Sequence, residues 1–503
     1  MATPFKKLKT NYYQVNKFIQ LKMKLKFIAT AVMAAQASMA IAASKPNIVL
    51  ILIDDMGYGD IEPFGATKCK TPALDRMASE GLKFTSFYAA PVCSASRSQI
   101  LTGCYAPRVS IPGVLPPGSA VGLNPTENTV ARQLKAQGYA TICIGKWHLG
   151  DQPEFFPRNY GFDHYFGIPY SNDMMRPKSD TGERVVPLMR DNQVVELLSD
   201  ADQDRLVRIY TEEAVTFIKA NKEHPFFLYL PHSAVHFPIH PGPAFQGHSG
   251  NGRYYDWVEE CDWSVGRVME TLRELHLDQN TLVIFTSDNG PWLSKGKDAG
   301  TAGPLRGGKG STWEGGMREP TLAVWPGHIP AGRATDAVAG EIDLLPTFVK
   351  LAGGTVPKDK QIDGADLSEI LFGKSDISLR EAHFYYRQFN LEAVRSGQWK
   401  LALKPQPFSM GFEENSTQFG VHEPGLRLYN LKTDVGETTD VAAKYPEVVK
   451  KLKELADKEA ASLCDGSAKG PGVRPPGQVS NPKFLYPTDA SKIKEKAKKV
   501  KIK

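Results

Sequence analysis

An almost unbroken apolar run, residues 46–53, ends abruptly at two adjacent carboxylates, Asp54 and Asp55. A short run of this kind is typical of a strand that is buried on both faces of a parallel sheet. Further runs of the same character, each followed by polar or glycine-containing sequence, are residues 139–144, 226–230, 281–286 and 321–325. The pattern predicts a buried sheet with polar groups beyond its strand ends.

Helix-like segments separate these apolar runs. They are residues 71–80, 129–137, 204–221 and 256–275. Strands that alternate with helices predict an α/β fold, in which helices sandwich a large, mostly parallel sheet.

The pattern changes after about residue 375. Short strand-like runs now follow one another, and an amphipathic helix-like segment, residues 446–463, comes after them. We expect a smaller C-terminal subdomain built from an antiparallel sheet plus a helix. From residue 465 the chain is rich in glycine and proline and then in lysine, which predicts an extended, mobile tail. The predicted divisions are residues 1–42, 43–375, 376–465 and 466–503.

The N-terminal extension, residues 1–42, contains the parts of a secretory signal peptide. A short basic stretch begins at Met23, an apolar run covers residues 27–39, and an Ala-x-Ala site ends at Ala42. We expect translation from Met23, cleavage near Ala42 and a periplasmic or secreted protein. A buried helix is the alternative. No second apolar run reaches the length of a membrane-spanning helix, so no stable membrane insertion is expected.

Charge and cysteine content exclude some classes of protein. The net charge is +6, but much of the excess lies at the two ends, so nucleic acid is not an expected partner. Six cysteines in 503 residues do not form a dense disulfide framework, and their spacing names no pairs. Zinc spacing of the C-x-x-C kind is absent.

Two of the predicted strands end in hard oxygen donors. Asp54 and Asp55 follow the first run, and Asp288 and Asn289 follow the run at residues 281–286. Adjacent carboxylates repel each other unless a cation lies between them. Each pair alone is better explained by a solvated strand end or a turn, but the two together favour a Ca²⁺ or Mg²⁺ site.

Cys93 lies in a segment of small and polar residues that becomes helix-like, and Arg97 follows four residues later. A cysteine at a helix N-terminus near an arginine would have a stabilised thiolate. A buried cysteine that only packs in the core is the alternative.

The wider sequence resembles the formylglycine-dependent sulfatases of the alkaline phosphatase superfamily. Cys93-x-Ala95-x-Arg97, with Gly103 downstream, is similar to the signature in which cysteine is oxidised to Cα-formylglycine, although many members have proline at position 95. Further matching blocks follow in the expected order over about residues 45–460. They contain Asp54-Asp55, Lys146-Trp147-His148, His236-Phe237-Pro238, Asp288-Asn289-Gly290, Lys309 and Leu428-Tyr429-Asn430-Leu431.

The resemblance implies that residues 43–375 are a sulfatase catalytic domain with one Ca²⁺. The implied metal ligands are Asp54, Asp55, Asp288 and Asn289, with residue 93 beside the ion. A hydrated formylglycine at position 93 would attack sulfur and later expel sulfate. A formylglycine-generating maturation enzyme is therefore an implied partner.

The resemblance also assigns the remaining catalytic residues. Asp288 would be the base that activates the hydrate, while Arg97 and Lys146 would hold it ionised. His148 would assist the elimination of sulfate. His236 and Lys309 would bind sulfate and protonate the leaving oxygen.

Two other functions remain open at this stage. A phosphonate monoester or phosphodiester hydrolase of the same superfamily would need similar groups, and a non-catalytic protein could bind sulfated glycans through its lysine-rich end. The motifs are most similar to the branch of arylsulfatase A and N-acetylgalactosamine-6-sulfatase, which implies a sulfated carbohydrate or polysaccharide substrate. We expect residues 153–200 and 408–423 to line the leaving-group side.

Overall fold

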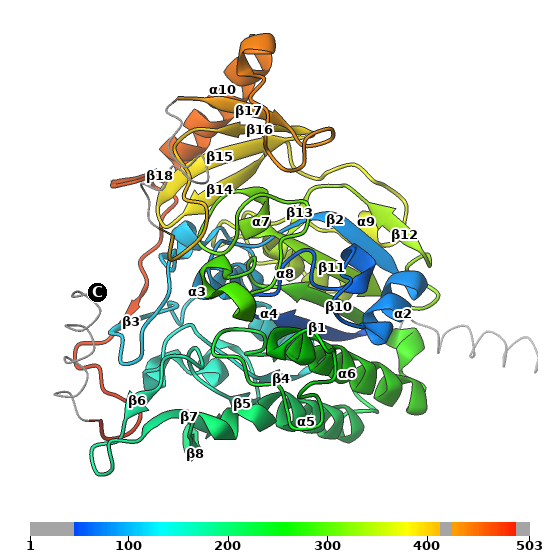
Figure 1. Ribbon diagram of the computed structural model, residues 1–503, viewed down its shortest axis with the longest axis vertical. Coiled ribbons are helices and arrows are strands. Elements are labelled where there is room, and N and C mark those ends of the chain that lie inside the picture. Colours follow the sequence, from blue (N-terminus) through cyan, green and yellow to red (C-terminus); the bar gives the residue numbers. More distant parts are fainter. Residues whose placement is uncertain (1–44, 413–424, 489–503) are drawn as a thin grey trace, which may run out of the picture. The chain divides into compact units, whose positions relative to one another are not determined.

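The computed structural model describes residues 45–412 and 425–488 and contains two principal sheets (Figure 1). The expected α/β architecture is confirmed. A large mixed sheet with a parallel centre carries helices on both faces, and a four-stranded antiparallel sheet follows in the C-terminal part of the chain.

The centre of the large sheet is parallel. Strand β1 (Asn47–Ile53) pairs with β10 (Thr281–Ser287) on one side and with β9 (Phe226–Pro231) on the other. Beyond β9 lie β4 (Ala140–Ile144) and β5 (His164–Gly167), also in parallel. Since Ile53 lies opposite Ser287, the residues that follow β1 and β10 emerge side by side.

Further strands extend this sheet at both edges. The full order is β12-β2-β11-β10-β1-β9-β4-β5-β7-β6, with β13 beside β2 and β8 beside β7. The edge strands not yet introduced are β2 (Leu82–Tyr88), β11 (Arg318–Val324), β12 (Arg333–Thr335), β13 (Ala339–Gly340), β6 (Arg176–Pro177), β7 (Arg184–Arg190) and β8 (Gln193–Leu198).

Strand β11 differs from its sequence interpretation in one respect. The apolar run at residues 321–325 does form part of a strand, but β11 is antiparallel to both β10 and β2. Its last residues therefore point away from the edge where β1 and β10 end. The beginning of β11, at Arg318 and Glu319, lies toward that edge instead.

The alternating side chains of β1 divide the core into two layers. Ile48, Leu50 and Leu52 contribute to one cluster, and Val49, Ile51 and Ile53 contribute to the other. The first layer packs against α3 (Cys93–Thr102), α4 (Val130–Ala136) and α8 (Leu344–Leu351). The second packs against α2 (Pro72–Glu80), α5 (Leu206–Ala220) and α6 (Arg253–Glu274). A strand buried on both faces explains the continuous apolar run.

The C-terminal sheet has the order β14-β15-β16-β17 and is antiparallel throughout, as predicted. Its elements are β14 (His383–Arg387), β15 (Asn390–Ser396), β16 (Trp399–Ala402), β17 (Arg427–Asn430) and the covering helix α10 (Pro446–Ser462). A buried ion network joins this sheet to the short helix α7 (Glu314–Met317). Lys400 Nζ lies 3.0 Å from Glu314 and 2.8 Å from Glu437.

The expectation of a free tail from residue 465 is wrong for residues 465–488. Short strands β18 (Cys464–Asp465) and β19 (Ala468–Lys469) form a hairpin, and β20 (Gly477–Gln478) pairs with β3 (Val121–Gly122) of the catalytic region. Backbone pairing and the buried ring of Tyr486 hold this segment against the catalytic region.

Residues 1–42, with the predicted signal peptide, and residues 489–503 lie outside the described residues, as does a short segment at 413–424. Among the helices described, none combines the length and apolar character needed to span a bilayer.

Candidate active site

The predicted metal ligands meet where β1 and β10 end. Asp54 and Asp55 follow β1, and Asp288 and Asn289 follow β10. All four side chains are buried. The backbone turns sharply at Asp55, whose φ of 61° is left-handed, and its N–H donates to Asp288 Oδ1 at 3.3 Å. This conformation is rare for residues other than glycine and is better tolerated by aspartate than by most.

Three buried carboxylates share this small volume and titrate differently. Burial opposes ionisation of Asp54, but Lys146 and the other nearby cations hold its pKa well below the usual range. Burial raises the pKa of Asp55 to about 7, despite the neighbouring Lys309. Burial, together with the charge of Asp54, also raises the pKa of Asp288. A bound cation would oppose both upward shifts.

The oxygens of the cluster fit a hard cation. Asn289 Nδ2 donates to Asp55 Oδ1 at 2.7 Å, yet Asp55 Oδ2 and Asn289 Oδ1 are buried without a hydrogen-bond partner. One ligand atom from each of Asp54, Asp55, Cys93 and His236 lies within 4.8 Å of the others. Buried oxygens without donors are costly unless a cation satisfies them, so this cluster is a candidate metal site.

Cys93 is the first residue of α3 and is 1% exposed. Its Sγ lies 3.3 Å from Asp54 Oδ1 and 3.6 Å from Lys309 Nζ. The expectation of a stabilised thiolate is wrong for this arrangement, because burial and then Asp54 raise the pKa of the Cys93 thiol well above its usual value. An unmodified cysteine here would be a poor nucleophile.

Arg97 and Lys146 neutralise the carboxylates. Arg97 Nη2 donates to Asp54 at 2.8 Å and to Asp288 at 2.9 Å, and Nη1 donates to the carbonyl of Lys146. Lys146 Nζ forms an ion pair with Asp54. Both cations are fully buried, so each depends on these partners for its charge. They act on residue 93 through Asp54.

A tight backbone approach positions Lys146. Gly145 precedes it with φ of 129°, and a Cβ at this glycine would lie 1.9 Å from the carbonyl oxygen of Pro231. The N–H of Lys146 donates to the same oxygen at 2.7 Å. Only glycine allows β4 to pass so close to the end of β9.

His148 lies beside the cluster and is buried. Its Nε2 is 3.2 Å from the carbonyl oxygen of Leu115, while its Nδ1 has no partner. Burial and then the charge of Lys146 lower its pKa well below the usual value, so the imidazole is neutral. A neutral ring with one unpartnered nitrogen is able to accept a proton.

His236 and Lys309 reach Asp55 from two further loops. Lys309 Nζ donates to Asp55 Oδ1 at 2.6 Å, and His236 Nε2 lies 3.7 Å from Asp55 Oδ2. Burial and then Lys309 lower the pKa of His236 well below its usual value. Burial would lower the pKa of Lys309, but Asp55 raises it, so Lys309 keeps its proton.

The fold also brings in residues that the sequence analysis missed. Ser171 Oγ accepts from Lys146 Nζ at 3.2 Å and lies 3.4 Å from both ring nitrogens of His236. No motif marks Ser171. The ring centroid of Trp292 lies 5.4 Å from that of His236. Trp292 comes three residues after Asn289, so its nearness in sequence to a predicted metal ligand could have indicated it.

The loops expected on the leaving-group side are only partly in agreement. Within residues 153–200, Ser171 reaches Lys146 and His236. Much of the second half of this range forms the edge strands β6, β7 and β8. The start of the other segment does reach the site, since the N–H of Met410 and the hydroxyl of Ser409 both donate to the Lys309 carbonyl. Residues 413–424 lie outside the described part of the chain.

A hollow of about 370 Å³ adjoins the cluster. Val92 and Gly310, which line it, are the chain neighbours of Cys93 and Lys309. Arg387, Gln388 and residues 409–412 contribute from the C-terminal sheet and its loop.

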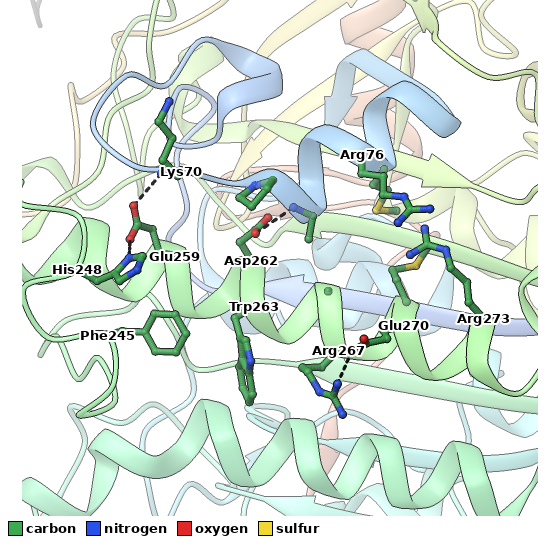
Figure 2. Close-up of a pocket in the computed structure, with 15 residues that line it drawn as sticks. Lys70, Arg76, Phe245, His248, Glu259, Asp262, Trp263, Arg267, Glu270 and Arg273 are labelled. Carbon is green, nitrogen blue, oxygen red and sulfur yellow. Dashed lines mark hydrogen bonds and ion pairs between the residues drawn. The ribbon is translucent and has the colours of Figure 1, made fainter.

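A larger hollow of about 600 Å³ lies between α2 and α6, away from these groups (Figure 2). Its charged side chains pair with one another, for example His248 with Glu259 and Arg267 with Glu270. None of the predicted site residues lines this hollow.

Comparisons with known proteins show the family of this chain. A family model described as "Sulfatase" matches residues 46–354, and a second, "C-terminal region of aryl-sulfatase", matches residues 378–470. N-acetylgalactosamine-6-sulfatase of Sus scrofa is 42% identical over 492 residues, covering 89% of this chain and 94% of that protein. Arylsulfatase A of Homo sapiens is 39% identical over 461 residues, covering 84% and 89%.

A solved structure from work on the metabolism of multiple glycosaminoglycans by Bacteroides thetaiotaomicron is also similar. It is 30% identical with a TM-score of 0.72, and the match covers 83% of this chain and 99% of that one. The fold, the buried cluster and these matches define a sulfuric ester hydrolase. The chain belongs to the sulfatase family.

Proposed function

We propose that this sulfatase removes sulfate from a sulfated carbohydrate, using formylglycine at position 93 and one Ca²⁺. The observation that carries the proposal is the convergence of Cys93, Lys309 and the carboxylates of Asp54 and Asp55 in one buried cluster beside an open hollow. The relatives' names, N-acetylgalactosamine-6-sulfatase among them, support a sugar sulfate as substrate.

Calcium would be held by Asp54, Asp55, Asp288 and Asn289, whose donor set is entirely oxygen. The two unpartnered buried oxygens, on Asp55 and Asn289, support this assignment. When bound, the ion would orient a sulfate oxygen and stabilise the charge that develops there.

Conversion of Cys93 to formylglycine would provide a hydrate, one hydroxyl for attack on sulfur and another for later release of sulfate. Since the residue is 1% exposed in the folded chain, its oxidation must precede the completion of folding. We therefore propose that a maturation enzyme acts on the unfolded or partly folded polypeptide.

Different residues around position 93 would accept protons and balance charge. Asp54 is nearest to position 93, but the cations around it hold its pKa low and make it a weak base. We assign the base to Asp288, as the sulfatase resemblance implies; Arg97 joins its carboxylate to that of Asp54. Arg97 and Lys146 balance the charge of these carboxylates. We assign the proton acceptor during sulfate release to His148, because its buried Nδ1 has no partner.

Lys309 and His236 would serve the leaving group. Lys309 keeps its proton and lies 3.6 Å from Sγ of residue 93, so it would bind a sulfate oxygen as a cation. His236 is neutral in the empty cluster, and the negative charge of bound sulfate would raise its pKa toward protonation. A protonated His236 beside Lys309 would then donate to the departing oxygen.

A substitution at position 93 tests this proposal. Cys93→Ala should abolish hydrolysis of aryl and sugar sulfates, while the matched control Cys143→Ala, at a buried cysteine in β4, should retain it. Intact-mass measurement of the active protein should show an aldehyde or its hydrate in place of the Cys93 thiol. Full activity with an unmodified Cys93, or a higher kcat/KM for the matched aryl phosphate, would contradict it.

We also propose export of the protein, on the strength of the sequence pattern alone. N-terminal sequencing of the protein from its native host should find a start just after Ala42. Recovery of a mature chain that still contains residues 23–42 would contradict the proposed cleavage.

A further inference from the structure

Trp292 lies at the edge of the active site and touches both residues assigned to the leaving group. Its ring centroid is 5.4 Å from that of His236 and 4.6 Å from Lys309 Nζ. The indole N–H donates to the carbonyl of Met410 at 3.1 Å, so the segment that follows β16 fixes the ring. The side chain is partly exposed, which leaves part of its surface available to a ligand.

Lys295 stands beside the same ring. Its Nζ lies 3.9 Å from the centroid of Trp292 and 4.4 Å from the centroid of Phe237, the residue directly after His236. Two aromatic faces therefore hold this ammonium group close to the leaving-group residues. The aliphatic stem loses mobility in such a position, so the charge is preorganised.

The charge of Lys295 is not balanced by a carboxylate. Lys146 and Lys309 pair with Asp54 and Asp55, but no ion pair involves Lys295 within residues 45–412 and 425–488. Both Lys295 and Lys309 lie within 4.6 Å of the centre of one indole ring. An unpaired cation at this distance from the sulfate-binding lysine is complementary to a second anionic group on the same substrate.

We propose that Lys295 binds a second acidic group, a carboxylate or another sulfate, of the saccharide whose sulfate is cleaved. The inference rests on the proposed function and narrows its substrate class to saccharides with at least two anionic groups. Trp292 and Phe237 hold the Lys295 ammonium, which donates to the second anion. An aryl sulfate, whose single negative charge is the sulfate that is cleaved, would not use Lys295.

Lys295→Met tests the inference, with Lys297→Met as the matched control. Lys297 belongs to the same short turn, is exposed and has no ion pair within the described residues. Three sugar substrates distinguish the source of the second charge: an N-acetylgalactosamine 6-sulfate glycoside, the same sugar with a second sulfate, and the same sugar linked to a uronic acid. Nitrophenyl sulfate, which has no sugar and no second anionic group, is the fourth substrate.

We expect Lys295→Met to lower kcat/KM about tenfold for one or both doubly charged sugars, in line with loss of one charge-assisted hydrogen bond. It should change kcat/KM less than twofold for the single-charge sugar and for nitrophenyl sulfate, and Lys297→Met should change none of them. Equal losses on all four substrates, or no loss on any, would overturn the inference.

A binding measurement separates this inference from the proposed function. In the Cys93→Ala background, which lacks turnover, calorimetry should show about tenfold weaker binding of the doubly charged sugars when Lys295→Met is added. Unchanged binding would refute the role of Lys295 and leave the sulfatase assignment intact. Absence of sulfate release by the wild-type protein, with Lys295-dependent binding retained, would instead refute the proposed substrate class for hydrolysis.

Discussion

Arg97 makes a prediction that tests the proposed calcium site without measuring turnover. Its guanidinium bridges Asp54 and Asp288 at 2.8 and 2.9 Å, and neither the arginine nor the two carboxylates is exposed. Arg97→Met would leave two buried carboxylates with too little positive charge around them. Breaking a buried ion pair in this way costs about 3–5 kcal/mol.

Calcium should restore part of the stability that Arg97→Met loses. In a unit as large as residues 46–503, 1 kcal/mol corresponds to a change in Tm of roughly 1 °C, so Tm should fall by about 3–5 °C in EDTA. Added Ca²⁺ should raise Tm more in Arg97→Met than in the wild type, because the guanidinium no longer competes for the carboxylates. Sulfatase activity should stay at least about a hundredfold lower, since the preorganised charge around residue 93 is lost.

Arg108 supplies the control. It is also buried and forms a two-point ion pair with Asp363, which is not among the proposed ligands. Differential scanning fluorimetry in EDTA and in calcium should show that Arg108→Met loses Tm equally in both. If Arg97→Met is as stable as the wild type in EDTA, or if calcium rescues both variants alike, the reasoning fails.

Two further predictions concern backbone fit and acid stability. Gly145→Ala should lower both Tm and activity because its Cβ would lie 1.9 Å from the Pro231 carbonyl, whereas Gly138→Ala, in open space, should cost only about 1 kcal/mol by urea titration. Burial lowers the pKa of His232 to about 3, so the stability that its neutral form supports is complete above pH 6.5 and is lost as pH falls toward 3. Between pH 8 and pH 5, the free energy of unfolding, measured by urea titration, should fall by about 2 kcal/mol less in His232→Gln than in the wild type. Equal falls in the two proteins would contradict this.

The central strands of the sheet could be predicted because each is a continuous apolar run in the sequence. The runs that form β1, β4, β9 and β10 are continuous in the chain and apolar on both faces. Asp54 and Asp288 were identified because each directly follows such a strand. The antiparallel direction of β11 was not predictable, since an apolar run has the same composition in either direction.

The packing of residues 465–488 could not be read from composition. Glycine and proline favour extended chain, but pairing of β20 with β3 depends on a strand more than 350 residues earlier. Only the folded chain brings such distant backbone groups together. The same holds for the ion network that joins Lys400 to Glu314, because no sequence motif connects them.

By itself, the sequence determined the α/β class, the strand ends that carry the oxygen donors, and the motifs around Cys93, because these properties depend on residues close together in the chain. The tertiary structure decided which groups meet. Lys309 and Cys93, 216 residues apart, come within 3.6 Å, and Lys295 comes to rest between Phe237 and Trp292. Such contacts depend on sheet order and loop paths, which local periodicity does not encode.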